Sequence, residues 1–160
     1  MINGDLIIAE GVANGDITLD NVKVTGNTYI RGGANSIHII GGSYANIIIE
    51  KTDDGKICVV TSDGAVVNTV YVDDGNDDVI LSGYFESVTV NADVKVVIDA
   101  GSSVTTLTVA ASGVNLTNNS IIGTLNVNAD GVVVEGKAPN RVNVGSGVTV
   151  SPPLTGTGTR

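Results

Sequence analysis

Residues 107–127, LTVAASGVNLTNNSIIGTLNV, decide the fold. Three short runs of the form apolar-x-apolar follow one another there: Leu107-Thr108-Val109, Val114-Asn115-Leu116 and Leu125-Asn126-Val127. Such short alternation predicts strands with one buried face, and the Gly, Ser and Asn residues between the runs are typical of turns. Because the first and third runs begin 18 residues apart, the stretch indicates one unit of a repeat.

The same rhythm covers nearly the whole chain as two interleaved series of runs, which we name face A and face B. The face A runs begin at Ile17, Ile37, Ile57, Val79, Val96, Val114, Val132 and Val148. The face B runs begin at Thr28, Ile47, Val70, Val88, Leu107, Leu125 and Val142. Nothing in the pattern predicts a helix. We therefore expect an all-β protein, a single-stranded parallel β-helix (solenoid) of roughly eight coils of about 18–22 residues, over residues 1–150.

A β-sandwich also contains many short strands and is the alternative fold. The nearly constant offset between equivalent runs favours the solenoid. A third short strand is expected in each coil, as Val22-Lys23-Val24 suggests in the first full one, although the later coils are shorter and show it poorly. Residues 151–160, SPPLTGTGTR, predict a Pro/Thr/Gly linker tail, which favours a module excised from a longer protein.

The composition excludes several functions. The chain has 160 residues with 3% aromatic residues, no Trp, one Cys, one His and a formal net charge of −9. This charge disfavours nucleic acid and anionic membranes as partners. One Cys and one His exclude a disulfide within the chain and multi-histidine or thiolate metal sites. The short apolar runs predict neither a membrane span nor a signal peptide within the chain.

Residues 15–51 resemble a β-helical region of large secreted surface proteins of Gram-positive bacteria. The stretch that carries the resemblance is 15–39, GDITLDNVKVTGNTYIRGGANSIHI. Proteins of that kind commonly carry surface-layer-homology domains and sometimes carbohydrate-binding modules. The resemblance implies an extracellular, cell-wall-associated, non-catalytic module that binds a polysaccharide or serves as a structural spacer or in adhesion. It supplies no catalytic motif.

The outward residues of face B suggest where a polysaccharide would bind. If the first and third residues of each run point inward, the middle residues form an outer ladder: Tyr29, Ile48, Tyr71, Thr89, Thr108, Asn126 and Asn143. Tyr29, Ile48 and Tyr71 would then make an aromatic-aliphatic strip on which sugar rings could stack. Arg31, Glu50 and Asp73 would lie beside it to bind hydroxyl groups. The alternative is that Tyr and Ile simply suit exposed strand positions.

Acidic residues concentrate in the first half of the chain, where residues 1–80 hold 12 acids and 4 bases. Two loops that follow successive face B runs would stack, and Ca²⁺ bound between their carboxylates would relieve the repulsion. The predicted ligands are Asp53, Asp54, Asp73, Asp74, Asp77 and Asp78. A solvated acidic surface that keeps the protein soluble is the alternative interpretation.

The outward residues of face A include Cys58, Ile80 and Val97, an apolar strip that suggests a loop cover, a misassigned run or a weak dimer. A polysaccharide lyase or glycosidase of the β-helix type is the alternative function. Glu50 and Asp73, in adjacent coils, could meet the spacing of a hydrolase pair. His38 has no supporting triad motif and is interpreted as an exposed strand residue.

Overall fold

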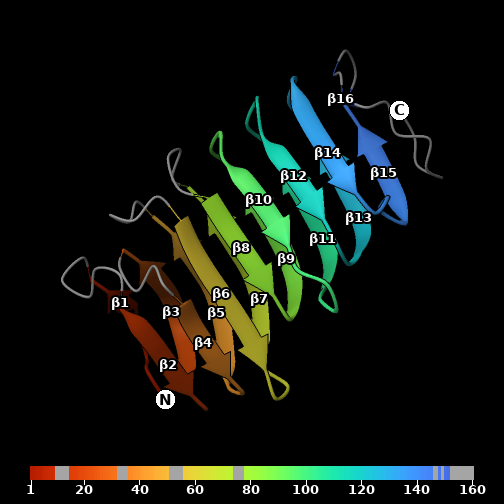
Figure 1. Ribbon diagram of the computed structural model, residues 1–160. Helices are drawn as coiled ribbons and strands as arrows, with labels where there is room; N and C mark the ends of the chain where they lie inside the picture. Colours follow the sequence, from red (N-terminus) through yellow and green to blue (C-terminus); the bar gives the residue numbers. More distant parts are fainter. Residues whose placement is uncertain are drawn as a thin grey trace.

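The computed structural model describes residues 1–9, 15–31, 36–50, 56–73, 78–145, 148 and 150–151. All named elements in these ranges are strands, and every strand pair is parallel. Figure 1 shows them stacked in chain order from β1 and β2 at one end to β15 and β16 at the other. The all-β solenoid is thereby confirmed. Parallel pairing between successive coils excludes the β-sandwich, which is built from antiparallel sheets.

Two eight-stranded sheets form the solenoid. The odd-numbered strands make the face B sheet: β1 (Leu6–Ile8), β3 (Lys23–Ile30), β5 (Ser43–Ile49), β7 (Val66–Val72), β9 (Tyr84–Val90), β11 (Ser103–Val109), β13 (Ile121–Val127) and β15 (Arg141–Val144). The even-numbered strands make the face A sheet: β2 (Asp16–Asp20), β4 (Ser36–Ile40), β6 (Lys56–Ser62), β8 (Asp78–Ser82), β10 (Lys95–Ile98), β12 (Asn115–Asn118), β14 (Val132–Gly136) and β16 (Val150–Ser151). About six turns are complete, and β1 and β16 are short strands at the two ends.

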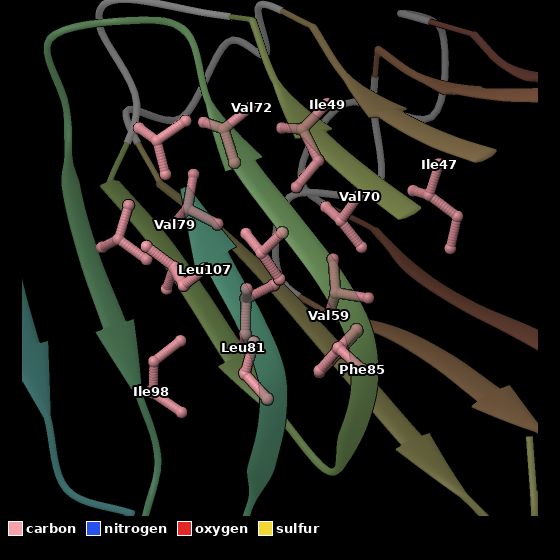
Figure 2. Packing of buried hydrophobic residues seen from close by; sticks show 14 of the residues in the cluster. Ile47, Ile49, Val59, Val70, Val72, Val79, Leu81, Phe85, Ile98 and Leu107 are labelled. Atoms are coloured by element: carbon pink, nitrogen blue, oxygen red, sulfur yellow. The ribbon is translucent and has the colours of Figure 1, made fainter. Parts of the chain in front are cut away.

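The core lies between the two sheets and consists almost entirely of Val, Ile and Leu. Figure 2 shows side chains of both sheets, among them Val59 and Leu81 of face A and Val70 and Leu107 of face B, packed together in this layer. Each of these four side chains is fully buried. Since β-branched residues fit the narrow space between stacked strands, the low aromatic content is a packing consequence.

A third layer of side chains continues through the later coils, whose sequence shows it only poorly. The first half of each long odd-numbered strand contributes one inward residue, and these stack as Val24, Tyr44, Val67, Phe85, Val104 and Ile122. The sequence pattern did not predict these residues, because the alternation of inward and outward side chains is interrupted between the first and second halves of each strand. A register irregularity between Val24 and Asn27 marks such an interruption in β3.

Three alignments predicted within face A are wrong by two residues. Ile37 pairs with Val59 instead of Ile57, Val96 with Leu116 instead of Val114, and Val132 with Val150 instead of Val148. A shift of two keeps every side chain on its side of the sheet, so alternation alone does not distinguish the two registers. Pairing Ile37 with Val59 is an offset of 22 residues, close to the offset of 23 between Ser43 and Val66 in the same coils.

Candidate functional site

The outer ladder of face B has the register that the sequence predicts. Tyr29 pairs with Ile48, Ile48 with Tyr71, and Tyr71 with Thr89, and the ladder continues through Thr108, Asn126 and Asn143. The residues on either side of the rungs from Tyr29 to Asn126 are buried, whereas at the Asn143 rung Val142 is buried and Val144 is half-buried. The strip of Tyr29, Ile48 and Tyr71 is therefore a continuous surface feature over three neighbouring coils, with half-buried side chains.

Ile7 extends this strip by one rung, which the sequence analysis missed. It pairs with Tyr29 and is 53% exposed. The signal was present in the sequence, since Leu6-Ile7-Ile8 has the form of a face B run 22 residues before Thr28. With strands about 4.8 Å apart, the four rungs span roughly 14 Å. We call Ile7, Tyr29, Ile48 and Tyr71 the face B strip.

Charged groups lie along the downstream side of the strip. Arg31 Nε donates to Glu50 Oε1 at 2.7 Å, and the guanidinium carbon lies 5.4 Å from the centre of the Tyr29 ring. Arg31 and Glu50 thus lie beside the strip, and their role in binding stays a prediction. Because both side chains are more than one third exposed, their ion pair adds little stability.

Two amide side chains border the strip on its upstream side, and the sequence analysis did not single them out. Asn27 Nδ2 donates to the Tyr29 hydroxyl at 3.1 Å, and Asn46 Nδ2 donates to Asn27 Oδ1 at 2.9 Å. These bonds tie the tyrosine to the neighbouring coil and limit its movement. The strip is consequently an apolar track with polar groups on both sides, which can contact the apolar face of a sugar ring and bind its hydroxyl groups.

The calcium prediction falls mainly outside the described residues, because Asp53, Asp54, Asp74 and Asp77 are not among them. Asp73 and Asp78 are described and are exposed. Asp73 Oδ1 accepts a hydrogen bond from Asn91 Nδ2 at 2.9 Å. Over the described ranges, no three His, Cys, Asp or Glu side chains are grouped closely enough to hold a metal ion. The calcium site stays a prediction.

Asp16, Ser36 and His38 meet on the outer side of the face A sheet. Ser36 Oγ lies 2.7 Å from Asp16 Oδ1 and 3.0 Å from His38 Nε2. As a carboxylate only accepts, the serine hydroxyl donates to Asp16 and His38 Nε2 donates to the serine. Activation of a nucleophilic serine needs the opposite arrangement, in which the serine donates to the histidine. The contact fits a hydrogen-bonded surface ladder better than a triad.

The apolar strip predicted on face A is also in register. Cys58 pairs with Ile80 and Ile80 with Val97, and all three side chains are half-buried. Val96 and Ile98 are fully buried, so the inward assignment of this run is correct. A dimer through this face stays a prediction.

Within the described part of the chain, no helix has the length and apolar character to span a membrane. Comparison of the chain with protein-family models, with curated proteins and with solved structures finds no match.

Proposed function

We propose that the protein is a non-catalytic module that binds a polysaccharide along the face B strip. One observation carries the proposal: Tyr29, Ile48 and Tyr71 occupy consecutive rungs of one outward ladder, with the Arg31–Glu50 pair beside them. Parallel stacking brings together residues that lie 19 to 23 positions apart in the sequence.

A flat, open strip suits a polymer better than a single sugar. Each ring that lies on Ile or Tyr would bury a small apolar area, and polar groups on both sides could bind the equatorial hydroxyls. Contacts of this size are weak individually, whereas several linked sugar units bound along the strip gain affinity through their high effective concentration. We therefore expect measurable binding for long chains and negligible binding for monosaccharides.

The proposed location is extracellular and associated with a bacterial cell wall, as part of a longer protein. The resemblance of residues 15–51 to secreted Gram-positive surface proteins supports it. A polysaccharide ligand would be abundant in such a place.

Affinity electrophoresis in gels that contain β-glucan, xylan or soluble chitin derivatives tests the proposal. We expect at least one polysaccharide to retard the wild-type protein. Tyr71→Ala should restore the mobility seen in a gel without polysaccharide, because it removes one of the two aromatic rings of the strip. Thr108→Ala, two rungs further along the same ladder, is the matched control and should stay retarded.

A structural spacer is the second candidate, favoured by the stiff stack of parallel strands itself. If no polysaccharide retards the protein although its fold is intact, glycan binding is contradicted and the spacer is favoured.

The enzyme alternative depends on Glu50 and Asp73, which directly follow the paired residues Ile49 and Val72. Both carboxylates already accept side-chain hydrogen bonds, from Arg31 and Asn91 respectively. Release of reducing or unsaturated sugars from pectin or glucan would support the enzyme.

A further inference from the structure

A cavity of about 540 Å³ lies where the chain crosses from β6 to β7. The β6–β7 turn, residues 61–67, forms one side of it, and Tyr84 and Glu86 of β9 in the next coil form the other. Its volume is within the range of small-molecule sites. It is separate from the face B strip, none of whose residues lines it.

The cavity combines an apolar surface with an aromatic wall. Val66 is 52% exposed and Tyr84 is 45% exposed, two of the few large apolar side chains on the described surface that are so open. The Tyr84 backbone is held firmly: its N–H donates to Thr61 Oγ1 at 2.8 Å, and Thr61 Oγ1 donates to its carbonyl at 3.1 Å. The aromatic wall is thus positioned before any ligand binds, which lowers the entropy cost of binding.

The charge of the lining is entirely negative. Asp63 and Glu86 contribute carboxylates, and the lining contains no Lys, Arg or His. Glu86 Oε2 accepts a hydrogen bond from the Tyr84 hydroxyl at 2.6 Å, which leaves its other oxygen available to a ligand. A ring face beside a carboxylate attracts a cation through both the ring quadrupole and the ionic hydrogen bond.

Elsewhere in the protein, a cation already occupies a place between a tyrosine ring and a glutamate. At the face B strip, Arg31 lies over the Tyr29 ring and pairs with Glu50. Tyr84 and Glu86 repeat the pairing of a tyrosine with a glutamate, with Asp63 as an additional carboxylate on the facing turn. We propose that this cavity binds a primary alkylammonium group, as carried by a lysine side chain or an amino sugar, with the alkyl part on Val66 and the ammonium group between Tyr84, Glu86 and Asp63.

Titration of the ¹⁵N-labelled full chain with n-pentylammonium chloride tests the proposal, with 1-pentanol as the neutral probe of equal length. We expect the amine to shift the amide signals of Asp63, Gly64, Val66, Tyr84 and Glu86, and the alcohol to shift them far less. Glu86→Gln keeps the shape and an acceptor for the Tyr84 hydroxyl. It should weaken binding about tenfold, as expected for the loss of one charge-assisted hydrogen bond. Glu135→Gln, at an exposed position of β14, is the matched control and should leave the affinity unchanged.

Two further probes distinguish the source of the ammonium group. Tighter binding of Nα-acetyl-lysine methylamide than of glucosamine supports a lysine side chain, and the reverse supports an amino sugar. Equal shifts with amine and alcohol, or an unchanged affinity in Glu86→Gln, would overturn the proposal. Because this experiment reads only signals of the cavity, a negative result would not contradict glycan binding at the face B strip. A negative result in the glycan experiment would likewise not contradict ammonium binding in the cavity.

Discussion

Tyr44 places a polar hydroxyl group in the apolar core of the solenoid. Its side chain is 1% exposed and stacks between Val24 and Val67, and its hydroxyl has no hydrogen-bond partner among the described residues. Burial raises the pKa of the Tyr44 hydroxyl from 10.0 to about 12. An unpaired buried hydroxyl costs stability that the ring's burial must offset. Thr28 is comparable, since in the described part of the chain its Oγ1 is buried without a hydrogen-bond partner, on a ladder with Leu6 and Ile47.

Tyr44→Phe should stabilise the protein. The substitution keeps the ring and removes the unpaired hydroxyl, so we expect the free energy of unfolding at pH 8 to rise by about 1 kcal/mol. Urea unfolding followed by circular dichroism measures the change. Tyr71→Phe, at a half-buried tyrosine, is the control and should change stability by less than about 0.5 kcal/mol. A less stable Tyr44→Phe would show that the hydroxyl has a partner after all.

The pH dependence follows from the same residue. Between pH 10 and 12 the unfolded chain releases the Tyr44 proton while the folded protein retains it, because the folded pKa is the higher one. The contribution of the protonated Tyr44 hydroxyl to the free energy of unfolding is fully present below pH 10 and is lost as the pH rises toward 12. Wild-type stability should therefore fall by roughly 2 kcal/mol more than that of Tyr44→Phe over this interval. Parallel alkaline slopes for the two proteins would contradict the assignment.

Sequence reasoning located Tyr29, Ile48 and Tyr71 correctly because alternation and a constant offset determine both the side and the rung of each residue. It missed Asn27 and Asn46 because they lie where the alternation is interrupted, next to the irregularity that follows Val24. At these positions the side-chain direction depends on the local backbone geometry, which the two-residue period of a regular strand does not predict.

The turns between the two sheets bring successive coils unusually close at certain glycines. Gly42 and Gly83 have positive φ values of 75° and 105°. A Cβ atom at Gly42 would collide with the carbonyl oxygen of Val22, and one at Gly83 with Thr61, each in the preceding coil. Glycine at these positions therefore permits both the left-handed backbone and the close approach.

Replacement of two glycines by alanine should separate these effects. Gly64 has φ 75° and open space around it, so Gly64→Ala should cost about 1 kcal/mol of strain alone. Gly83→Ala adds the collision with Thr61 and should cost about 3 kcal/mol or more. Thermal or urea unfolding of both variants measures the difference. Equal losses would mean that the coils can separate at this corner.

The turns also explain which elements could be predicted. The odd-numbered strands follow the period closely, so all seven face B runs align as expected. The even-numbered strands follow loops and turns of varying length, and three of their registers differ by two residues from the predicted ones. The cavity could not be predicted, because it forms between a turn and a strand of different coils.

At the scale of the whole molecule, the chemical character of the face B ladder changes along the solenoid. Its C-terminal half is polar and satisfies itself: Asn143 Nδ2 donates to Asn126 Oδ1 at 2.9 Å, and Asn126 Nδ2 donates to Thr108 Oγ1 at 3.4 Å. Its N-terminal half is the apolar and aromatic strip. Because each coil contacts mainly its neighbours, one end can carry a binding surface without altering the stability of the other.

The measurement that tests this account most directly is a residue-resolved map of glycan binding. Cellohexaose, xylohexaose and chitohexaose would be titrated into the ¹⁵N-labelled protein, and the amide shifts mapped onto the ladder. If the face B strip binds a glycan, at least one oligosaccharide shifts the signals of Ile7, Tyr29, Ile48 and Tyr71 and leaves those of Asn126 and Asn143 in place. Shifts centred on another face, or none at the strip with any of the three, would contradict it.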